Sequence, residues 1–284
     1  MDAEIRFEGV SFRYADDEEP APSASGEPIP SGDEPAPQAP SPVLFRGLDL
    51  ELPPGVVSFI GQNGTGKSTL LLLASGRLLP TEGRVLIRGR DSRELTDESD
   101  RQSLVSFVYQ NMEFETEQPI GELLRYVRDH GLKPEEDGIE ELVEVFELGR
   151  VLRRRTQEVS KGELQRAILA FSLLYGSPIL VMDEPIFALE EPQKKRVMEY
   201  LCERVRRDGL SLYYSLHELD LSREYSDYLL LFFRDGPPRL GVTSEMFNRK
   251  TIEEAYEVPF DFLKRREEIY RSYLTELLKV RRKG

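Results

Sequence analysis

Nine consecutive residues, GQNGTGKST, have the spacing of a phosphate-binding loop. Gly61 and Gly66 are followed by Lys67 and Ser68, and the loop lies between the apolar run VVSFI and the helix-like run TLLLLASGRLL. Glycines let successive backbone N–H groups turn toward phosphate oxygens, and a helix N-terminus adds unpaired N–H groups. A lysine at this place reaches the β- and γ-phosphates, and a serine hydroxyl can hold Mg²⁺. The motif therefore predicts a site for a nucleoside triphosphate.

Two adjacent carboxylates further along the chain suit the same chemistry. Asp183 and Glu184 end PILVMDEP, an apolar run of strand length. Asp183 is placed to hold Mg²⁺ opposite Ser68, and Glu184 to polarise an attacking water. The alternative is a strand that simply ends in a solvated acidic turn. A pair of acids after five apolar residues, downstream of the loop, favours the functional interpretation.

Apolar strand-like runs alternate with helical patterns over most of the chain. These strands and helices must position the phosphate-binding loop and the two carboxylates. Helix-like runs lead into the strand-like runs PILVMDEP, LSLYYSLHE and YLLLFF. This alternation predicts a parallel sheet wrapped by helices. Residues 111–158 instead show helical spacing of apolar positions and predict a helical insertion.

Composition excludes several classes of protein. The net charge of −14 disfavours a nucleic-acid binder, so no nucleic acid partner is expected. No apolar run approaches the roughly 20 residues that span a bilayer, and the acidic N-terminus lacks a signal region. Cys202 is the only cysteine, which agrees with a reducing cytoplasm.

Residues 15–42 differ from the rest of the chain. These 28 residues contain eight prolines, seven acids and no lysine or arginine. Such a segment buries too little apolar surface to offset its ordering entropy, so a disordered acidic insertion is predicted. A solvated insertion without function is the favoured interpretation, and docking to a basic partner is the alternative.

Six features in one order resemble the ATP-binding cassette (ABC) family of ATPases. The segment VSKGELQRAILA resembles the family signature, Leu-Ser-Gly-Gly-Gln, with the helix that follows it. Gln110, ending VSFVYQ, matches the glutamine of the Q-loop, and His217 matches the histidine after a later strand. Tyr14 matches the aromatic residue that stacks on adenine. With the loop and the Asp183–Glu184 pair, the resemblance extends over nearly the whole chain.

The resemblance implies a role for each of these positions. The implied catalytic residues are Glu184, His217 and Gln110, and the implied magnesium ligands are Ser68, Gln110 and Asp183. Expected contacts to ATP are made by Tyr14, Gly61, Asn63, Gly64, Thr65, Gly66, Lys67, Ser68 and Thr69. The signature residues Ser160, Lys161, Gly162 and Glu163 would contact ATP held by a second cassette, because family members dimerise head to tail. Whether that dimer is homomeric or heteromeric stays open.

The implied fold is α/β: a P-loop NTPase (RecA-like) core with a parallel sheet, an N-terminal antiparallel β portion and an inserted helical lobe. The core is expected at residues 1–110 and 159–240, the signature lobe at 111–158, and a C-terminal helical extension at 241–284.

Three positions depart from the family pattern. Lys161 replaces the first signature glycine, Glu163 replaces the glutamine, and Glu190 stands where an aspartate is usual. Because Glu184 is intact, we expect hydrolysis. The change at Glu190 leaves communication between subunits open.

The end of the chain resembles one group of importers within the family. HELDLSREYSDYLLLF and TIEEAYEVPF resemble the endings of cassettes that serve ferric-siderophore, haem and cobalamin importers, with Glu257 where glycine is usual. The same residues could equally serve only to pack the helix.

Two functions are compatible with these features. The first is an ATPase subunit that powers transport through separate membrane subunits, which would place it in the cytoplasm at the inner face of the cell membrane. The alternative is a soluble ABC ATPase without a transport role, for example in iron–sulfur assembly. We expect the segment after Gln110, with Met112 and Phe114, to expose a docking surface for a membrane subunit. The alternative is that these two side chains pack the core of the helical lobe. Neither the cargo nor its direction follows from the sequence.

Overall fold

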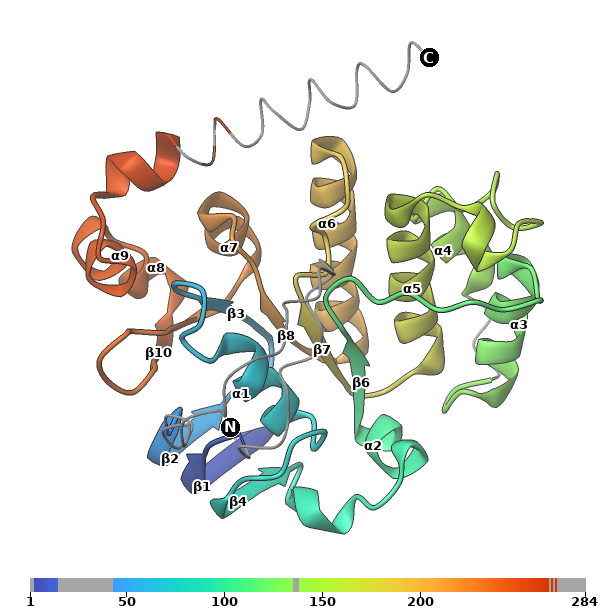
Figure 1. Cartoon of the computed structure of the whole chain (residues 1–284). Helices are drawn as coiled ribbons and strands as arrows, with labels where there is room; N and C mark the ends of the chain where they lie inside the picture. Colours follow the sequence, from blue (N-terminus) through green and yellow to red (C-terminus); the bar gives the residue numbers. More distant parts are fainter. Residues whose placement is uncertain (1–2, 15–42, 135–137, 266, 268, 270–284) are drawn as a thin grey trace, which may run out of the picture.

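The computed structural model describes residues 3–14, 43–134, 138–265, 267 and 269 (Figure 1). The predicted acidic insertion at 15–42 lies outside the described residues. Two sheets and the helices around them make up the described part of the chain.

The larger sheet has six strands in the order β10-β9-β3-β8-β7-β6. β3 pairs in parallel with β8 and β9, β7 pairs in parallel with β8 and β6, and only β10 is antiparallel to its neighbour. The inner strands are apolar on both faces, as expected of a sheet covered on both sides. The strands are β3 (Val56–Ile60), β6 (Val105–Val108), β7 (Ile179–Asp183), β8 (Ser211–Ser215), β9 (Tyr228–Leu231) and β10 (Arg239–Val242).

The smaller sheet is antiparallel, with the order β2-β1-β4-β5. β1 lies between β2 and β4, and Ile5 stands opposite both Leu52 and Ile87. All three side chains are buried. The strands are β1 (Ile5–Phe12), β2 (Phe45–Leu52), β4 (Glu82–Ile87) and β5 (Arg90–Asp91).

Helices cover both faces of the larger sheet. The helices of the described residues are α1 (Lys67–Ala74), α2 (Glu98–Leu104), α3 (Ile120–His130), α4 (Ile139–Val145), α5 (Lys161–Tyr175), α6 (Glu191–Asp208), α7 (Leu219–Tyr225), α8 (Thr243–Met246) and α9 (Arg249–Tyr256), with 3₁₀ turns at Ser92–Glu94 and Thr156–Glu158. In Figure 1, α3, α4 and α5 gather beside β6, and α8 and α9 lie at the opposite side near β10.

Alternate residues of β7 show how the two faces are filled. Leu180 and Met182 lie in a cluster with side chains of α5 and α6, whereas Ile179 and Val181 lie in a second cluster with α1 and the antiparallel sheet. A third cluster joins Ile60, at the end of β3, to apolar residues of α9 and the segment after it. Because successive side chains of a strand point to opposite faces, β7 packs against α5 and α6 on one face and against α1 and the antiparallel sheet on the other, and β3 links the phosphate-binding loop to α9.

The predicted fold class is confirmed: the protein has a parallel α/β core, an antiparallel β portion and helices beside β6. The domain boundaries drawn from the sequence stay a prediction. Met112 and Phe114, expected to be exposed, are half-buried and pack against the core cluster, with the Phe114 ring 6.4 Å from that of Phe171. Their apolar character is therefore explained by packing.

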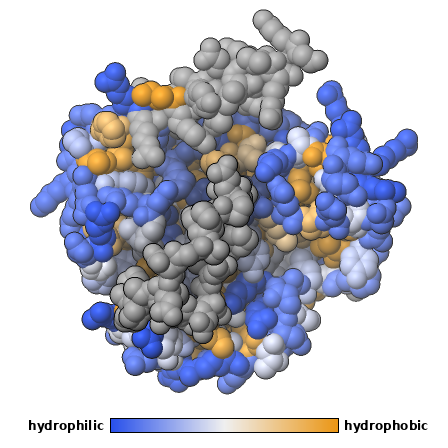
Figure 2. Space-filling model, viewed as in Figure 1, coloured by the Kyte–Doolittle hydropathy of each residue, from blue (hydrophilic) through white to orange (hydrophobic). Residues whose placement is uncertain are grey.

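The visible surface is mostly hydrophilic, with apolar residues in separate patches (Figure 2). Within the described part of the chain, none of the helices combines the length and the apolar character needed to cross a bilayer.

Phe146 joins the helical region to α6, since it is fully buried and its ring meets that of Tyr200 edge-on at 5.8 Å. We expect Phe146→Ala to lower the free energy of unfolding by about 3–5 kcal/mol, because it removes a buried ring and leaves a cavity. Urea denaturation measures this loss. Leu79→Ala, at a half-exposed position, should cost far less, and equal losses in the two variants would contradict this packing.

Candidate functional site

The phosphate-binding loop follows β3 directly, and two of its glycines could not be replaced without displacing neighbours. Gly61 has φ 151°, and a Cβ there would lie 2.8 Å from the carbonyl oxygen of Phe232. Gly66 has φ 98°, and its Cβ would lie 2.8 Å from the Phe45 ring. The loop therefore curls tightly against β2 and the end of β9 before α1 begins at Lys67.

Lys67 is buried beneath this curl, with only 8% of its surface exposed. Its Nζ donates hydrogen bonds of 2.8 Å to the carbonyl oxygens of Gly61 and Gln62. Burial lowers the pKa of Lys67, and the nearby carboxylates of Glu184 and Asp183 act in the opposite direction. Thr65 Oγ1 also donates to Gln62 O, at 2.8 Å. The loop thus encloses a strong cationic donor beside a cavity.

Ser215, at the end of β8, contacts both predicted acidic residues at the end of β7, through the side chain of Asp183 and the backbone of Glu184. Ser215 Oγ donates to Asp183 Oδ1 and accepts a hydrogen bond of 3.0 Å from the backbone N–H of Glu184. Asp183 is buried, and Glu184 has φ 48°, a left-handed conformation that is uncommon for residues with a side chain. The turn at Glu184 gives the two adjacent carboxylates different directions.

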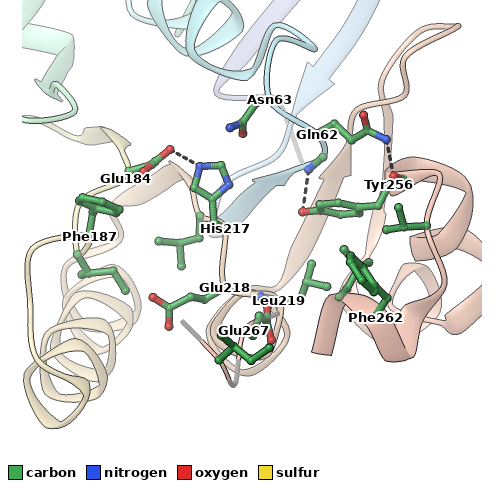
Figure 3. A pocket seen from close by; sticks show the side chains of 16 residues that line it. Gln62, Asn63, Glu184, Phe187, His217, Glu218, Leu219, Tyr256, Phe262 and Glu267 are labelled. Atoms are coloured by element: carbon green, nitrogen blue, oxygen red, sulfur yellow. Dashed lines mark hydrogen bonds and ion pairs between the residues drawn. The ribbon is translucent and has the colours of Figure 1, made fainter. Parts of the chain in front are cut away.

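Glu184 and His217 meet across the carboxyl edge of the sheet. His217 Nε2 lies 2.6 Å from Glu184 Oε1, as the dashed line in Figure 3 shows. The Glu184 side chain is 11% exposed and that of His217 is 43% exposed. An imidazole and a carboxylate in contact at the rim of a cavity can orient one another and exchange hydrogen bonds with a bound group.

A cavity of about 370 Å³ gathers most of the predicted site residues. Tyr14 reaches it from the end of the antiparallel sheet, with its hydroxyl 2.8 Å from Thr69 Oγ1 and its ring edge-on to Phe12. Gln110 reaches it from the exposed end of β6. The lining residues are Tyr14, Leu44, Asn63, Gly64, Gly66, Lys67, Ser68, Thr69, Gln110, Asp183, Glu184 and His217.

Six predicted residues are not part of that lining. Gly61 and Thr65 belong to the phosphate-binding loop itself, and the other four lie at the start of α5. Ser160 is the N-cap: its Oγ accepts from the N–H of Glu163 and donates to Glu163 Oε2, while Glu163 Oε2 also accepts from the Ser160 N–H at 2.8 Å. Lys161 is exposed and pairs with Glu113 at 2.9 Å. Gly162 packs so closely on the segment after Glu184 that a Cβ would lie 2.8 Å from Ala188 O.

Gln165 and Arg166 fix this helix start to the rest of the protein. Gln165 Nε2 donates to Pro185 O at 2.9 Å, and Arg166 donates to Phe146 O at 2.8 Å and to Gln193 Oε1 at 3.0 Å. The signature helix therefore rests on the loop that carries Glu184. Glu190, at the end of that loop, is the N-cap of α6, and its N–H donates to Gln193 Oε1 at 3.3 Å.

Sequence reasoning missed three residues that position the site. Ser215 lies within SLYYSLHEL, two residues before His217. That spacing is the sequence signal that could have indicated its place in the site. Gln62 and Tyr256 contact one another across the loop. Most of the chain separates these two residues in the sequence, so no local pattern indicates that they are in contact.

The comparisons agree with this geometry. In a comparison with known protein families, the sequence model of the ABC transporter family matches residues 45–187. The petrobactin import ATP-binding protein FatE of Bacillus anthracis is 28% identical over 230 residues, covering 78% of this chain and 91% of FatE. The molybdenum import ATP-binding protein ModC of Brucella abortus is 26% identical over 197 residues, covering 68% of this chain. The chain spans 55% of ModC, so it reaches about half the length of the first relatives it matches.

A solved dimeric structure of a bacterial ABC transporter cassette superimposes with a TM-score of 0.68 at 21% identity, covering 84% of this chain and 98% of the cassette. This likeness shows the shared fold.

The cap of α5 generates a pH prediction. Burial opposes ionisation of Glu163, but the hydrogen bonds from Ser160 and the charges of Arg166 and Arg154 outweigh it and lower the pKa of Glu163 below its ordinary value of 4.5. A carboxylate whose pKa is lower in the folded than in the unfolded protein stabilises the fold at pH values above the unfolded-state pKa. That stabilisation is lost as the pH falls through the folded-state pKa.

We therefore expect the free energy of unfolding to be larger for wild type than for Glu163→Gln near neutral pH. This difference between the two proteins should shrink as the pH falls below about 4.5. Urea titrations across pH measure it. Glu82→Gln, at the exposed start of β4, serves as the control and should show no such trend. A pH-independent difference for Glu163→Gln would contradict the assigned contacts.

Proposed function

This chain belongs to the ABC transporter family, and from that premise we propose that it binds and hydrolyses ATP to power transport through separate membrane subunits. The observation that carries the proposal is the single cavity in which Lys67 and Ser68 of the loop face Asp183 and Glu184 of β7, with Gln110 and His217 at its rim.

The loop suits a triphosphate. The loop leads directly into α1, which begins at Lys67, and a helix N-terminus favours anions. Lys67 already uses its ammonium group on two backbone carbonyls, and phosphate oxygens are stronger acceptors for the same donors. Tyr14 is 39% exposed and its hydroxyl is anchored by Thr69, which supports the assignment of its ring as the contact for adenine.

The residues present also suit a magnesium ion, which requires oxygen ligands. Ser68, Asp183 and Gln110 would hold it, since all three line the cavity and Ser215 already orients the Asp183 carboxylate. Bound Mg²⁺ supplies charge that neutralises the β- and γ-phosphate oxygens.

Glu184 and His217 would assist the reaction itself. Glu184 accepts a proton from the attacking water as the water oxygen bonds to the γ-phosphorus and the bond to the β-phosphate oxygen breaks, which yields ADP and phosphate. His217 can donate a hydrogen bond to the γ-phosphate. The contact between Glu184 and His217 keeps both side chains at the reacting end of the cavity.

The signature residues support a dimer. Ser160, Lys161, Gly162 and Glu163 form a helix start away from the chain's own cavity, so they would meet ATP bound by a second cassette. ATP would then close two subunits head to tail, and hydrolysis would release them. Gly162 and Gln165 contact the loop that follows Glu184. When a second cassette closes against the signature residues, a displacement there can therefore move the Glu184 carboxylate.

Transport requires membrane subunits, and the protein would act beside them at the inner face of the cell membrane. The printed names of FatE and ModC, both import ATP-binding proteins, support an importer. Copurification with a polytopic membrane protein tests this part. Its failure, with ATPase activity intact, would favour the soluble alternative.

Glu184→Gln tests hydrolysis. The substitution keeps the shape of the side chain but removes the charge that polarises water, so we expect ATP binding to persist while turnover falls by about 100-fold or more. The variant should accumulate as a dimer with ATP and Mg²⁺, visible by size-exclusion chromatography. Glu94→Gln, at an exposed position, should behave as wild type. Wild-type turnover in Glu184→Gln would contradict the assignment of this residue.

A further inference from the structure

The C-terminal part of the described chain is packed against the phosphate-binding loop. Ile60, the last residue of β3, shares a buried cluster with Ile252 and Ala255 of α9 and with Leu263 beyond it. These contacts place the end of α9 beside Gly61, and nothing in the proposed reaction uses them.

Polar contacts join Tyr256, the last residue of α9, to the loop from two directions. The backbone N–H of Gly61 donates to Tyr256 Oη at 3.2 Å, and Gln62 Nε2 donates to the carbonyl oxygen of Tyr256. Figure 3 shows both contacts, with the Tyr256 ring lying along the loop. Gln62 Nε2 is also 3.4 Å from Glu257 Oε2.

The same two loop residues hold Lys67 from the other side. Their carbonyl oxygens accept from Lys67 Nζ, while the Gly61 N–H and the Gln62 side chain are occupied by Tyr256. The first turn of the loop is therefore held between the lysine and the tyrosine. Burial raises the pKa of Tyr256, so the neutral phenol is the form present near neutral pH.

We propose that Tyr256 is a positioning residue for ATP binding: its hydroxyl and its carbonyl oxygen hold Gly61 and Gln62 in the conformation that presents the loop to phosphate. This inference rests on the proposed function and adds to it a residue that lies outside the expected catalytic, ATP-binding and signature residues. Tyr256 touches neither catalytic carboxylate in the structure, and it acts through the loop.

Packing alone does not explain these contacts. Apolar residues already bury α9, and a phenylalanine would fill the same space as the tyrosine ring. The backbone turns sharply at Glu257, which has φ 54° and caps α9 through its N–H to Glu253 O. This left-handed turn, where glycine is the usual choice, ends the helix at the residue whose carbonyl meets Gln62.

The C-terminal segment is held on its far side as well. Lys264 pairs with Asp220, and Glu267 accepts from the backbone N–H of Leu219, two residues after His217. The segment that carries Tyr256 is thus fixed to the loop of His217, so it can act as a rigid support for the phosphate-binding loop.

Tyr256→Phe tests the proposal, with Tyr213→Phe as its matched control. Both remove one phenol hydroxyl at opposite ends of β3, since Tyr213 donates to Pro53 O at 2.9 Å before that strand begins. We expect Tyr256→Phe to raise the dissociation constant and the KM for ATP about 2- to 10-fold with kcat little changed, because a loop contact made equally in ground and transition states is lost. Tyr213→Phe should lower thermal stability without altering ATP affinity.

Gln62→Met gives an independent arm, because it keeps the side-chain length and removes the donor to Tyr256. It should weaken ATP binding in the same direction. The double variant should lose less than the two single losses combined, since the two separate contacts hold the same turn of the loop. Wild-type affinity in Tyr256→Phe, or equal effects in Tyr213→Phe, would overturn this inference alone. A wild-type protein that binds no ATP would overturn the proposed function as well.

Discussion

The buried ammonium group of Lys67 is the constraint on which the rest of the site depends. A buried lysine is costly unless its donors are satisfied, and here two carbonyls of the loop accept them at 2.8 Å. Those carbonyls can turn inward only because the loop curls at Gly61 and Gly66, where a Cβ would collide with neighbouring groups. The carboxylates of Asp183 and Glu184 stand opposite, brought to the same edge by the parallel pairing of β7 and β8.

From this constraint a chain of contacts leads outward in two directions. Ser215 fixes the turn between Asp183 and Glu184, and the segment after Glu184 supports the start of α5 through Gln165 and Gly162. On the other side, Tyr256 supports the first residues of the loop. A change of shape at the nucleotide can therefore reach both the surface expected to meet a second cassette and the C-terminal segment.

The sequence predicted the parts of the site that depend on local spacing. Backbone geometry and helix capping act over short stretches of chain. About ten residues were therefore enough to indicate each of three features: the loop, the strand ending in Asp183 and the capped helix start at Ser160. The contact of Tyr256 with Gly61 was not predictable, since it depends on how α9 docks against β3. The acidic neighbours of Met112 and Phe114 predict exposed side chains, but Phe171 of α5 lies beside Phe114. Only the fold reveals such long-range packing.

Equilibrium titration of Mg-ATP into wild type and Lys67→Ala measures whether Lys67 and the loop around it bind the phosphates of ATP. Lys195→Ala, an exposed lysine of α6, is the control for loss of a positive charge. We expect Lys67→Ala to weaken ATP binding by roughly 10- to 100-fold, because a charged hydrogen bond is lost, while Lys195→Ala should bind ATP as wild type does. Equal affinity of wild type and a folded Lys67→Ala protein would contradict this expectation.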